Sequence, residues 1–213
     1  MNNGIHDKKA RIPILISLII VSLAEIIFRA VAVGEAALST ANAGEQVTVI
    51  AFATIILFFT EKGNDRISYV CCGVFIAYFV MDQLFEFPGM LGNMLANISN
   101  PIISVSIAIR LLTMIGIIAI SAFLIEYIND GSIYNRAFIA CYWLTVLLHV
   151  VLICVNIGCI IFADAPDGME LSFLRKQTAL LIFNNLYRII MVVLFTSFAY
   201  DSAKLQLKRE KLS

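Results

Sequence analysis

Six long apolar segments constrain what this chain can fold into more than any other feature of its sequence. An α-helix rises about 1.5 Å per residue, so about 20 mostly apolar residues cross the hydrocarbon core of a membrane. The segments that come near this length are approximately residues 12–33, 46–60, 68–87, 101–128, 137–163 and 178–200. They predict an all-α fold, a polytopic bundle of about six transmembrane helices that forms a single integral membrane domain over residues 1–213.

The composition indicates that lipid is the solvent for much of this chain. Hydrophobic residues make up 61% of the 213 residues, and charged residues only 14%. A soluble domain is typically about 45–50% apolar and about 25% charged, so the apolar excess is larger than a core of this size requires. The formal net charge is +0, which gives no electrostatic reason to expect nucleic acid as a partner.

Prolines and glycines mark the predicted ends of several spans. Pro13 and Pro101 each fall in the first turn of a predicted helix, where the missing N–H does no harm. Pro88 and Gly89 are expected to end the third span. Connections such as residues 63–65 are too short for a soluble domain. Recognition of any partner must therefore occur within the bundle or at its rims.

The distribution of lysine and arginine predicts the orientation of the spans, because cytoplasmic loops retain positive charge. Ten basic residues fall on the side that carries both termini: Lys8, Lys9, Arg11, Lys62, Arg66, Arg136, Lys204, Lys208, Arg209 and Lys211. The opposite side holds only Arg175 and Lys176. Both termini are therefore expected in the cytoplasm, with residues 201–213 as a basic tail, and the membrane is expected to be the plasma (inner) membrane.

Ionisable and polar residues inside the predicted spans are the candidates for a functional site. A charged side chain near the centre of a membrane helix costs about 2.5–3.5 kcal/mol on insertion scales, so it faces the protein interior and usually has a partner. The topology places most of these groups in the half of the membrane away from the termini. The candidate ligand-binding residues are Glu25, Arg29, Asp82, Glu86, Arg110, His149, Asn156, Asn184 and Arg188.

Helical spacing predicts which candidates share a helix face. Glu25 and Arg29 lie four residues apart, which brings their opposite charges together on one helix. Asn184 and Arg188 have the same spacing. Each pair is therefore expected to point in one direction.

Two further spacings concern the third and fifth spans. Asp82 and Glu86 are four apart but carry like charges, so they need an arginine between them, a proton or a cation. Tyr142, His149 and Asn156 recur every seven residues and form a polar seam along the fifth span. Both spacings predict polar contacts toward the interior of the bundle.

Two interpretations of the charges inside the spans remain open. In the first, three arginines and three carboxylates neutralise one another and lock the helices together. In the second, they line a cavity open to the extracytoplasmic side. There, Arg29, Arg110 and Arg188 would bind an anion or act as a gate, while Asp82 and Glu86 would bind a cation or neutralise those arginines.

No motif in the sequence predicts catalysis or a bound cofactor. The chain has no G-x-S-x-G nucleophile motif, no H-E-x-x-H zinc motif and no glycine-rich phosphate loop. His149 is the only histidine in a predicted span, which excludes haem ligation by two histidines. We therefore expect neither an enzyme nor a site for a metal or a cofactor.

The function favoured by these features is recognition or transport of a small polar or charged solute through a charged cavity in the outer half of the bundle. The alternative is a membrane sensor or receptor. Lys204, Lys208 and Lys211 continue helical spacing beyond the last span, and such a helix can pass a signal to a partner membrane or cytoplasmic protein. A third hypothesis is a structural subunit of a membrane complex.

Overall fold

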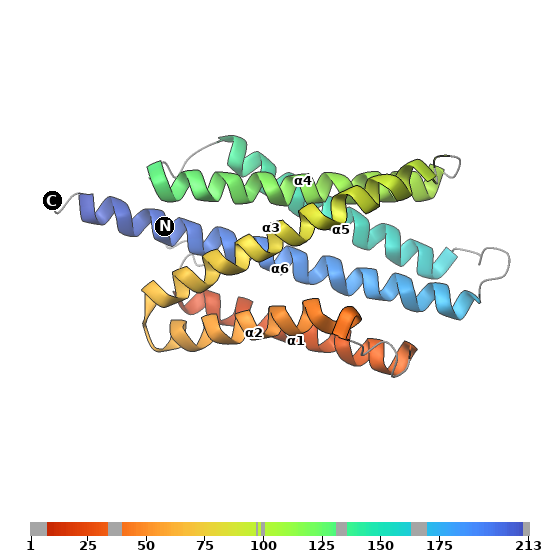
Figure 1. The fold of residues 1–213 in the computed structure, drawn as a ribbon, viewed down its shortest axis with the longest axis horizontal. Helices are drawn as coiled ribbons and strands as arrows, with labels where there is room; N and C mark the ends of the chain where they lie inside the picture. The colour runs from red at the N-terminus through yellow and green to blue at the C-terminus, as the bar shows by residue number, and fades with distance from the viewer. Residues whose placement is uncertain are drawn as a thin grey trace.

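Six α-helices make up nearly all of the chain that the computed structural model describes, residues 8–33, 40–96, 98, 101–130, 136–162 and 170–210 (Figure 1). They are α1 (Lys8–Val33), α2 (Thr40–Glu61), α3 (Asp65–Ala96), α4 (Pro101–Asp130), α5 (Arg136–Phe162) and α6 (Leu171–Glu210). All six are long and apolar enough to cross a membrane. The prediction of an all-helical chain with six spans of this kind is therefore confirmed.

The helices run alternately in opposite directions, and α6 lies at the centre of the bundle (Figure 1). It separates the pair α1 and α2 from the pair α4 and α5, while α3 crosses the bundle obliquely. α6 packs against α1, α3, α4 and α5. In its most apolar stretch 50% of the residues are buried inside the bundle, against 22–33% in the other helices.

Connections lie at both ends of the bundle, and Figure 1 shows which helix termini share an end. We call the end with the start of α1 and the finish of α6 the terminal end. The opposite end, which we call the far end, carries the helix termini at Val33, Thr40, Ala96, Pro101, Phe162 and Leu171.

The helix α3 corrects one prediction. It continues through Pro88 and Gly89 to Ala96, so the expectation that these residues end the third span was wrong. A proline removes one backbone hydrogen bond. In apolar surroundings, however, the remaining backbone groups are best satisfied if the helix continues, and Met90 and Leu91 extend its apolar sequence.

Besides α3, the helices α2 and α6 extend furthest beyond their predicted spans. α2 begins at Thr40 and has 22 residues, so the second span is not short, and Glu45 lies on the helix rather than in a loop. α6 begins at Leu171, which places Arg175 in its first turns. The same helix reaches Glu210, well beyond the predicted end of the sixth span near residue 200.

Aromatic rings fill the core between α2, α3 and α6. The rings of Phe52 and Phe75 stack with their centroids 4.9 Å apart. The Phe195 ring contacts Phe75 edge-on at 5.7 Å and Phe79 at 6.0 Å. Such contacts give well-defined geometry in addition to the apolar area that they bury.

Arg11, at the terminal end, is also part of the packed interior. It was expected on the solvated cytoplasmic flank, but it is only 1% exposed. Its guanidinium carbon lies 4.4 Å from the centroid of the Phe198 ring, which is a cation–π contact between α1 and α6.

Helix α4 contacts α5 tightly at Gly116. A Cβ atom added there would overlap Thr145 Oγ1 and lie 3.2 Å from Thr145 Cβ. The Thr145 carbonyl accepts a hydrogen bond from His149 Nδ1 at 2.8 Å. The glycine therefore allows α5 to come close enough to bury both Thr145 and His149.

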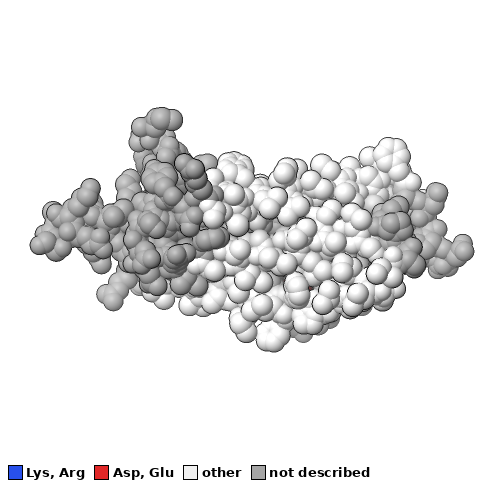
Figure 2. Space-filling view, turned by 90° about the horizontal axis from the view of Figure 1, so that it is seen from above, with Lys and Arg blue, Asp and Glu red and all other residues white. Residues whose placement is uncertain are grey.

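The side of the bundle formed by α4 and α5 carries no Lys, Arg, Asp or Glu among its described residues (Figure 2). Large apolar side chains on these helices are exposed, for example Leu112 and Ile115 on α4 and Leu144 and Leu147 on α5. A continuous apolar surface is unfavourable in water and suits contact with lipid acyl chains.

Candidate functional site

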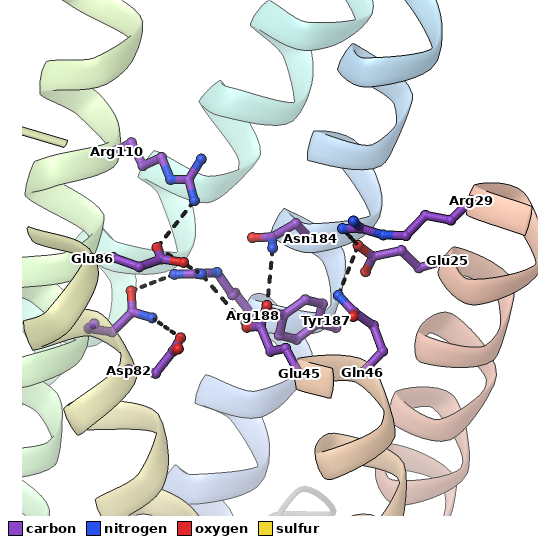
Figure 3. A network of polar contacts seen from close by, with 11 residues as sticks. Glu25, Arg29, Glu45, Gln46, Asp82, Glu86, Arg110, Asn184, Tyr187 and Arg188 are labelled. Atoms are coloured by element: carbon purple, nitrogen blue, oxygen red, sulfur yellow. Dashed lines mark hydrogen bonds and ion pairs between the residues drawn. The ribbon is translucent and has the colours of Figure 1, made fainter. Parts of the chain in front are cut away.

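Charged and polar side chains from α1, α2, α3, α4 and α6 meet in one network (Figure 3). We call this group the polar network. Its members are Glu25, Arg29, Glu45, Gln46, Asp82, Gln83, Glu86, Arg110, Asn184, Tyr187 and Arg188. The structure thus brings together seven of the nine sequence-predicted site residues, namely Glu25, Arg29, Asp82, Glu86, Arg110, Asn184 and Arg188.

Arg188 lies at the centre of the polar network and is 2% exposed. Its Nη1 donates a hydrogen bond to Gln83 Oε1 on α3. Its Nη2 lies 3.6 Å from Glu86 Oε2 and 3.9 Å from Glu45 Oε1. The arginine of the central helix is therefore shared between carboxylates of α2 and α3.

Glu86 connects this arginine to a second one. Arg110 on α4 donates from Nη2 to Glu86 Oε2 at 3.3 Å, so that Glu86 lies between Arg110 and Arg188. The sequence left an arginine, a proton or a cation open as the partner of the like-charged pair on α3, and the structure places two arginines beside Glu86. Asp82 accepts a hydrogen bond from Gln83 Nε2 at 3.2 Å. Of the described residues, no arginine or lysine lies within ion-pair distance of Asp82.

Tyr187 adds a second link between α6 and α2. Its hydroxyl donates to Glu45 Oε1 and accepts from Asn184 Nδ2 at 3.4 Å. Asn184 thus joins the polar network through Tyr187, and within the described residues it forms no hydrogen bond with Arg188. α2 is not among the helices that α6 packs against, so long side chains bridge these two helices.

The Glu25–Arg29 pair is confirmed. Arg29 Nη2 donates to Glu25 Oε1 at 2.7 Å, and Glu25 is 0% exposed. Gln46 on α2 donates from Nε2 to the same oxygen at 3.0 Å. The pair that was expected within one helix therefore also joins α1 to α2.

The polar network contains one more carboxylate than arginines. Its carboxylates are Glu25, Glu45, Asp82 and Glu86, and its arginines are Arg29, Arg110 and Arg188. Four formal negative charges against three positive charges leave a net charge of −1. The equal numbers of arginines and carboxylates predicted from sequence become unequal because the longer α2 includes Glu45 in a candidate membrane span, Ala43–Glu61.

Two predicted site residues lie outside the polar network. His149 and Asn156 are both buried on α5. His149 Nδ1 bonds to the Thr145 carbonyl, and its Nε2 has no hydrogen-bond partner. Within the described residues, no hydrogen bond or ion pair joins either of them to the polar network. Tyr142 shares this face and packs against the core.

Sequence reasoning missed four members of the polar network. Glu45 and Gln46 were assigned to a loop and to the edge of a short span, because the start of α2 is polar. Gln83 and Tyr187 are adjacent in sequence to predicted site residues. A search for every polar side chain within an apolar helix would have found both.

Among the described residues, no three His, Cys, Asp or Glu side chains are placed to hold a metal ion together.

Comparisons with models of protein families, with curated proteins and with solved structures found no match to this chain. The six apolar helices are compatible with a multi-pass membrane protein. The geometry of the polar network is therefore the basis for assigning a more specific function.

Proposed function

We propose that this multi-pass membrane protein recognises or transports a small solute that carries a positively charged group, at the part of the polar network around Arg188. The observation that supports this most directly is the excess of one carboxylate over arginines in a partly buried network. Each arginine is already paired with a carboxylate. Asp82 is the carboxylate without such a partner, and a cationic group would neutralise it.

The arrangement around Arg188 also suits a site that rearranges. Its Nη2 lies 3.6 Å from Glu86 and 3.9 Å from Glu45, which are distances beyond a good hydrogen bond. Glu86 is shared with Arg110. Placing charges within a membrane is costly, and helices can pack without them. A chain of shared ion pairs from four helices allows pairs to exchange when a solute enters.

We also propose that both termini lie in the cytoplasm, since the basic residues gather at the terminal end and cytoplasmic segments retain positive charge. In a bacterial host, green fluorescent protein fused to the C-terminus is expected to fluoresce. Alkaline phosphatase fused between α3 and α4 is expected to be active, because it needs the oxidising side of the membrane. The reverse pattern of activities would contradict this orientation.

Binding of a cationic solute is expected to stabilise the purified protein against heat, since a ligand that binds only the folded state raises its stability. The probes are small amines, zwitterionic amino acids and small carboxylates. An amine or a zwitterion should raise the melting temperature. Asp82→Asn should increase the concentration needed for half of this effect by about tenfold or more, because a contact between charges is lost.

The matched control is Glu61→Gln, which makes the same type of change at an exposed position at the end of α2. This variant should respond to the solute as the wild type does. A response only to carboxylates, or one that Asp82→Asn leaves intact, would contradict the proposal. Absence of any response would favour a structural subunit of a membrane complex, in which the polar network serves only to join helices.

A membrane sensor is the second candidate, favoured by the continuation of α6 from Phe198 at the end of its apolar stretch to Glu210. Such a helix can transmit a movement to a partner protein. Truncation after Tyr200 separates the two functions. A sensor would keep solute binding and lose signalling, whereas a transporter would keep uptake. Neither function calls for catalysis, a cofactor or nucleic acid.

A further inference from the structure

The part of the polar network that joins α1 to α2 contains buried oxygen atoms without a partner. Ser22 and Glu25 on α1 are both 0% exposed, and Gln46 on α2 is 1% exposed. Glu25 uses only Oε1 for its two hydrogen bonds, to Arg29 and to Gln46. Three oxygen atoms are left without any hydrogen-bond partner: Ser22 Oγ, Glu25 Oε2 and Gln46 Oε1.

Three such atoms on two helices that pack together call for a physical explanation. A buried polar atom without a partner costs free energy, and nearly all of them in folded proteins are satisfied by protein, water or an ion. The oxygens of Glu25 and Gln46 act only as acceptors. An occupant of this site must therefore supply positive charge or donors to them.

The geometry brings the three side chains into one region. Ser22 and Glu25 are three residues apart and thus share a face of α1. The Gln46 amide is bonded to Glu25, so its carbonyl oxygen lies beside the same carboxylate (Figure 3). The region is therefore bounded by two packed helices and is closed to solvent.

The chemistry of the three oxygens favours a monovalent cation. Carboxylate, amide and hydroxyl oxygens are the ligands of hard cations such as alkali and alkaline-earth ions. Calcium and magnesium sites depend on carboxylates, but this region offers only Glu25, which is already paired with Arg29.

We infer that Ser22, Glu25 and Gln46 form a binding site for a sodium ion. Its use as a coupling ion, as in secondary transporters that hold Na⁺ near the middle of the membrane, rests on the proposed function. The binding itself does not. The competing occupant is a water molecule, which could accept a hydrogen bond from the unpartnered Arg29 Nε as well as donate to the oxygens.

The test measures thermal unfolding of the purified protein in detergent at fixed pH and ionic strength, with NaCl replaced stepwise by KCl. We expect a saturable rise of the melting temperature with Na⁺. Ser22→Ala should raise the Na⁺ concentration for half-saturation by about tenfold, as expected when one contact with a charged ligand is lost. Gln46→Leu should act in the same direction.

The Ser22→Ala variant is chosen because the hydroxyl it removes bonds to nothing else, so no internal hydrogen bond is lost. The matched control is Ser121→Ala on α4. Its buried hydroxyl donates to the Ile117 carbonyl at 2.9 Å. This variant should keep the Na⁺ dependence of the wild type, even if its melting temperature is lower.

Three results would overturn the inference. Equal stabilisation by sodium and potassium would indicate a general salt effect. A response to pH that Glu25→Gln removes, without a response to Na⁺, would assign the site to a proton. Absence of both responses would assign it to water. Stabilisation by a cationic solute in KCl without any Na⁺ response would leave the proposed function standing. A Na⁺ response without stabilisation by a cationic solute would support this site alone.

Discussion

Replacing Arg188 by methionine is expected to lower the free energy of unfolding by about 3–5 kcal/mol, the usual cost of removing one partner from a buried ion pair. Methionine has a similar length and retains apolar packing near the Phe79 ring, 5.7 Å from the guanidinium. The loss comes instead from Glu86 and Glu45, which would remain in the bundle without the arginine between them.

Chemical unfolding in detergent, followed by fluorescence or circular dichroism, measures this change. The matched control is Arg175→Met on the same helix. Arg175 is exposed near the far end, so its replacement should change the stability by no more than about 0.5 kcal/mol. Equal stabilities of the two variants would show that the ion pairs of Arg188 do not contribute to the free energy of unfolding.

The same substitution can be partly compensated if the explanation is correct. Adding Glu86→Gln to Arg188→Met removes the charge of a carboxylate that has lost one of its two arginine partners. The double variant should therefore be more stable than the sum of the two single changes predicts, by about 0.5–3 kcal/mol, the range measured for residues in contact. Additive effects would mean that the two side chains are not coupled.

Gly116→Ala is expected to lower the free energy of unfolding by about 1–3 kcal/mol, as overpacking of a tight core does. The new Cβ would overlap Thr145 Oγ1 and lie 3.3 Å from Thr145 Cγ2. α4 and α5 would have to separate. The same unfolding measurement in detergent tests this effect.

Two further variants make the explanation specific. Thr145→Ala removes both Oγ1 and Cγ2, so combining it with Gly116→Ala should recover part of the lost stability. Gly73→Ala on α3 is the control, because nothing lies within 4 Å of the Cβ that it adds. It should leave the stability unchanged or raise it by up to about 1 kcal/mol, since alanine favours helix more than glycine does. A loss equal to that of Gly116→Ala would contradict the steric explanation.

The features that could be predicted from sequence are those that depend on local spacing. The number and approximate position of the helices follow from runs of apolar residues, since length and hydropathy decide whether a segment can cross a membrane. The contact between Glu25 and Arg29 follows from one turn of helix. In both cases the interacting groups lie close together along the chain.

The remaining features depend on which helices become neighbours. Nothing in the local sequence shows that Arg188 would meet Gln83, since 105 residues separate them. Likewise, Glu45 could be placed only after the start of α2 was known. The continuation of α3 past Pro88 depends on the surroundings of the helix rather than on the proline itself. Three-dimensional packing decides each of these outcomes.

The central position of α6 has a consequence for biosynthesis. Translation proceeds from the N-terminus, so α1 to α5 leave the ribosome before the helix that most of them pack against. Glu45 and Glu86 therefore enter the membrane before Arg188 has been made. Until α6 is inserted, Glu86 can pair with Arg110 of α4, whereas Glu45 must be stabilised by a proton, water or the insertion machinery. Assembly of the bundle is thus completed by its last helix.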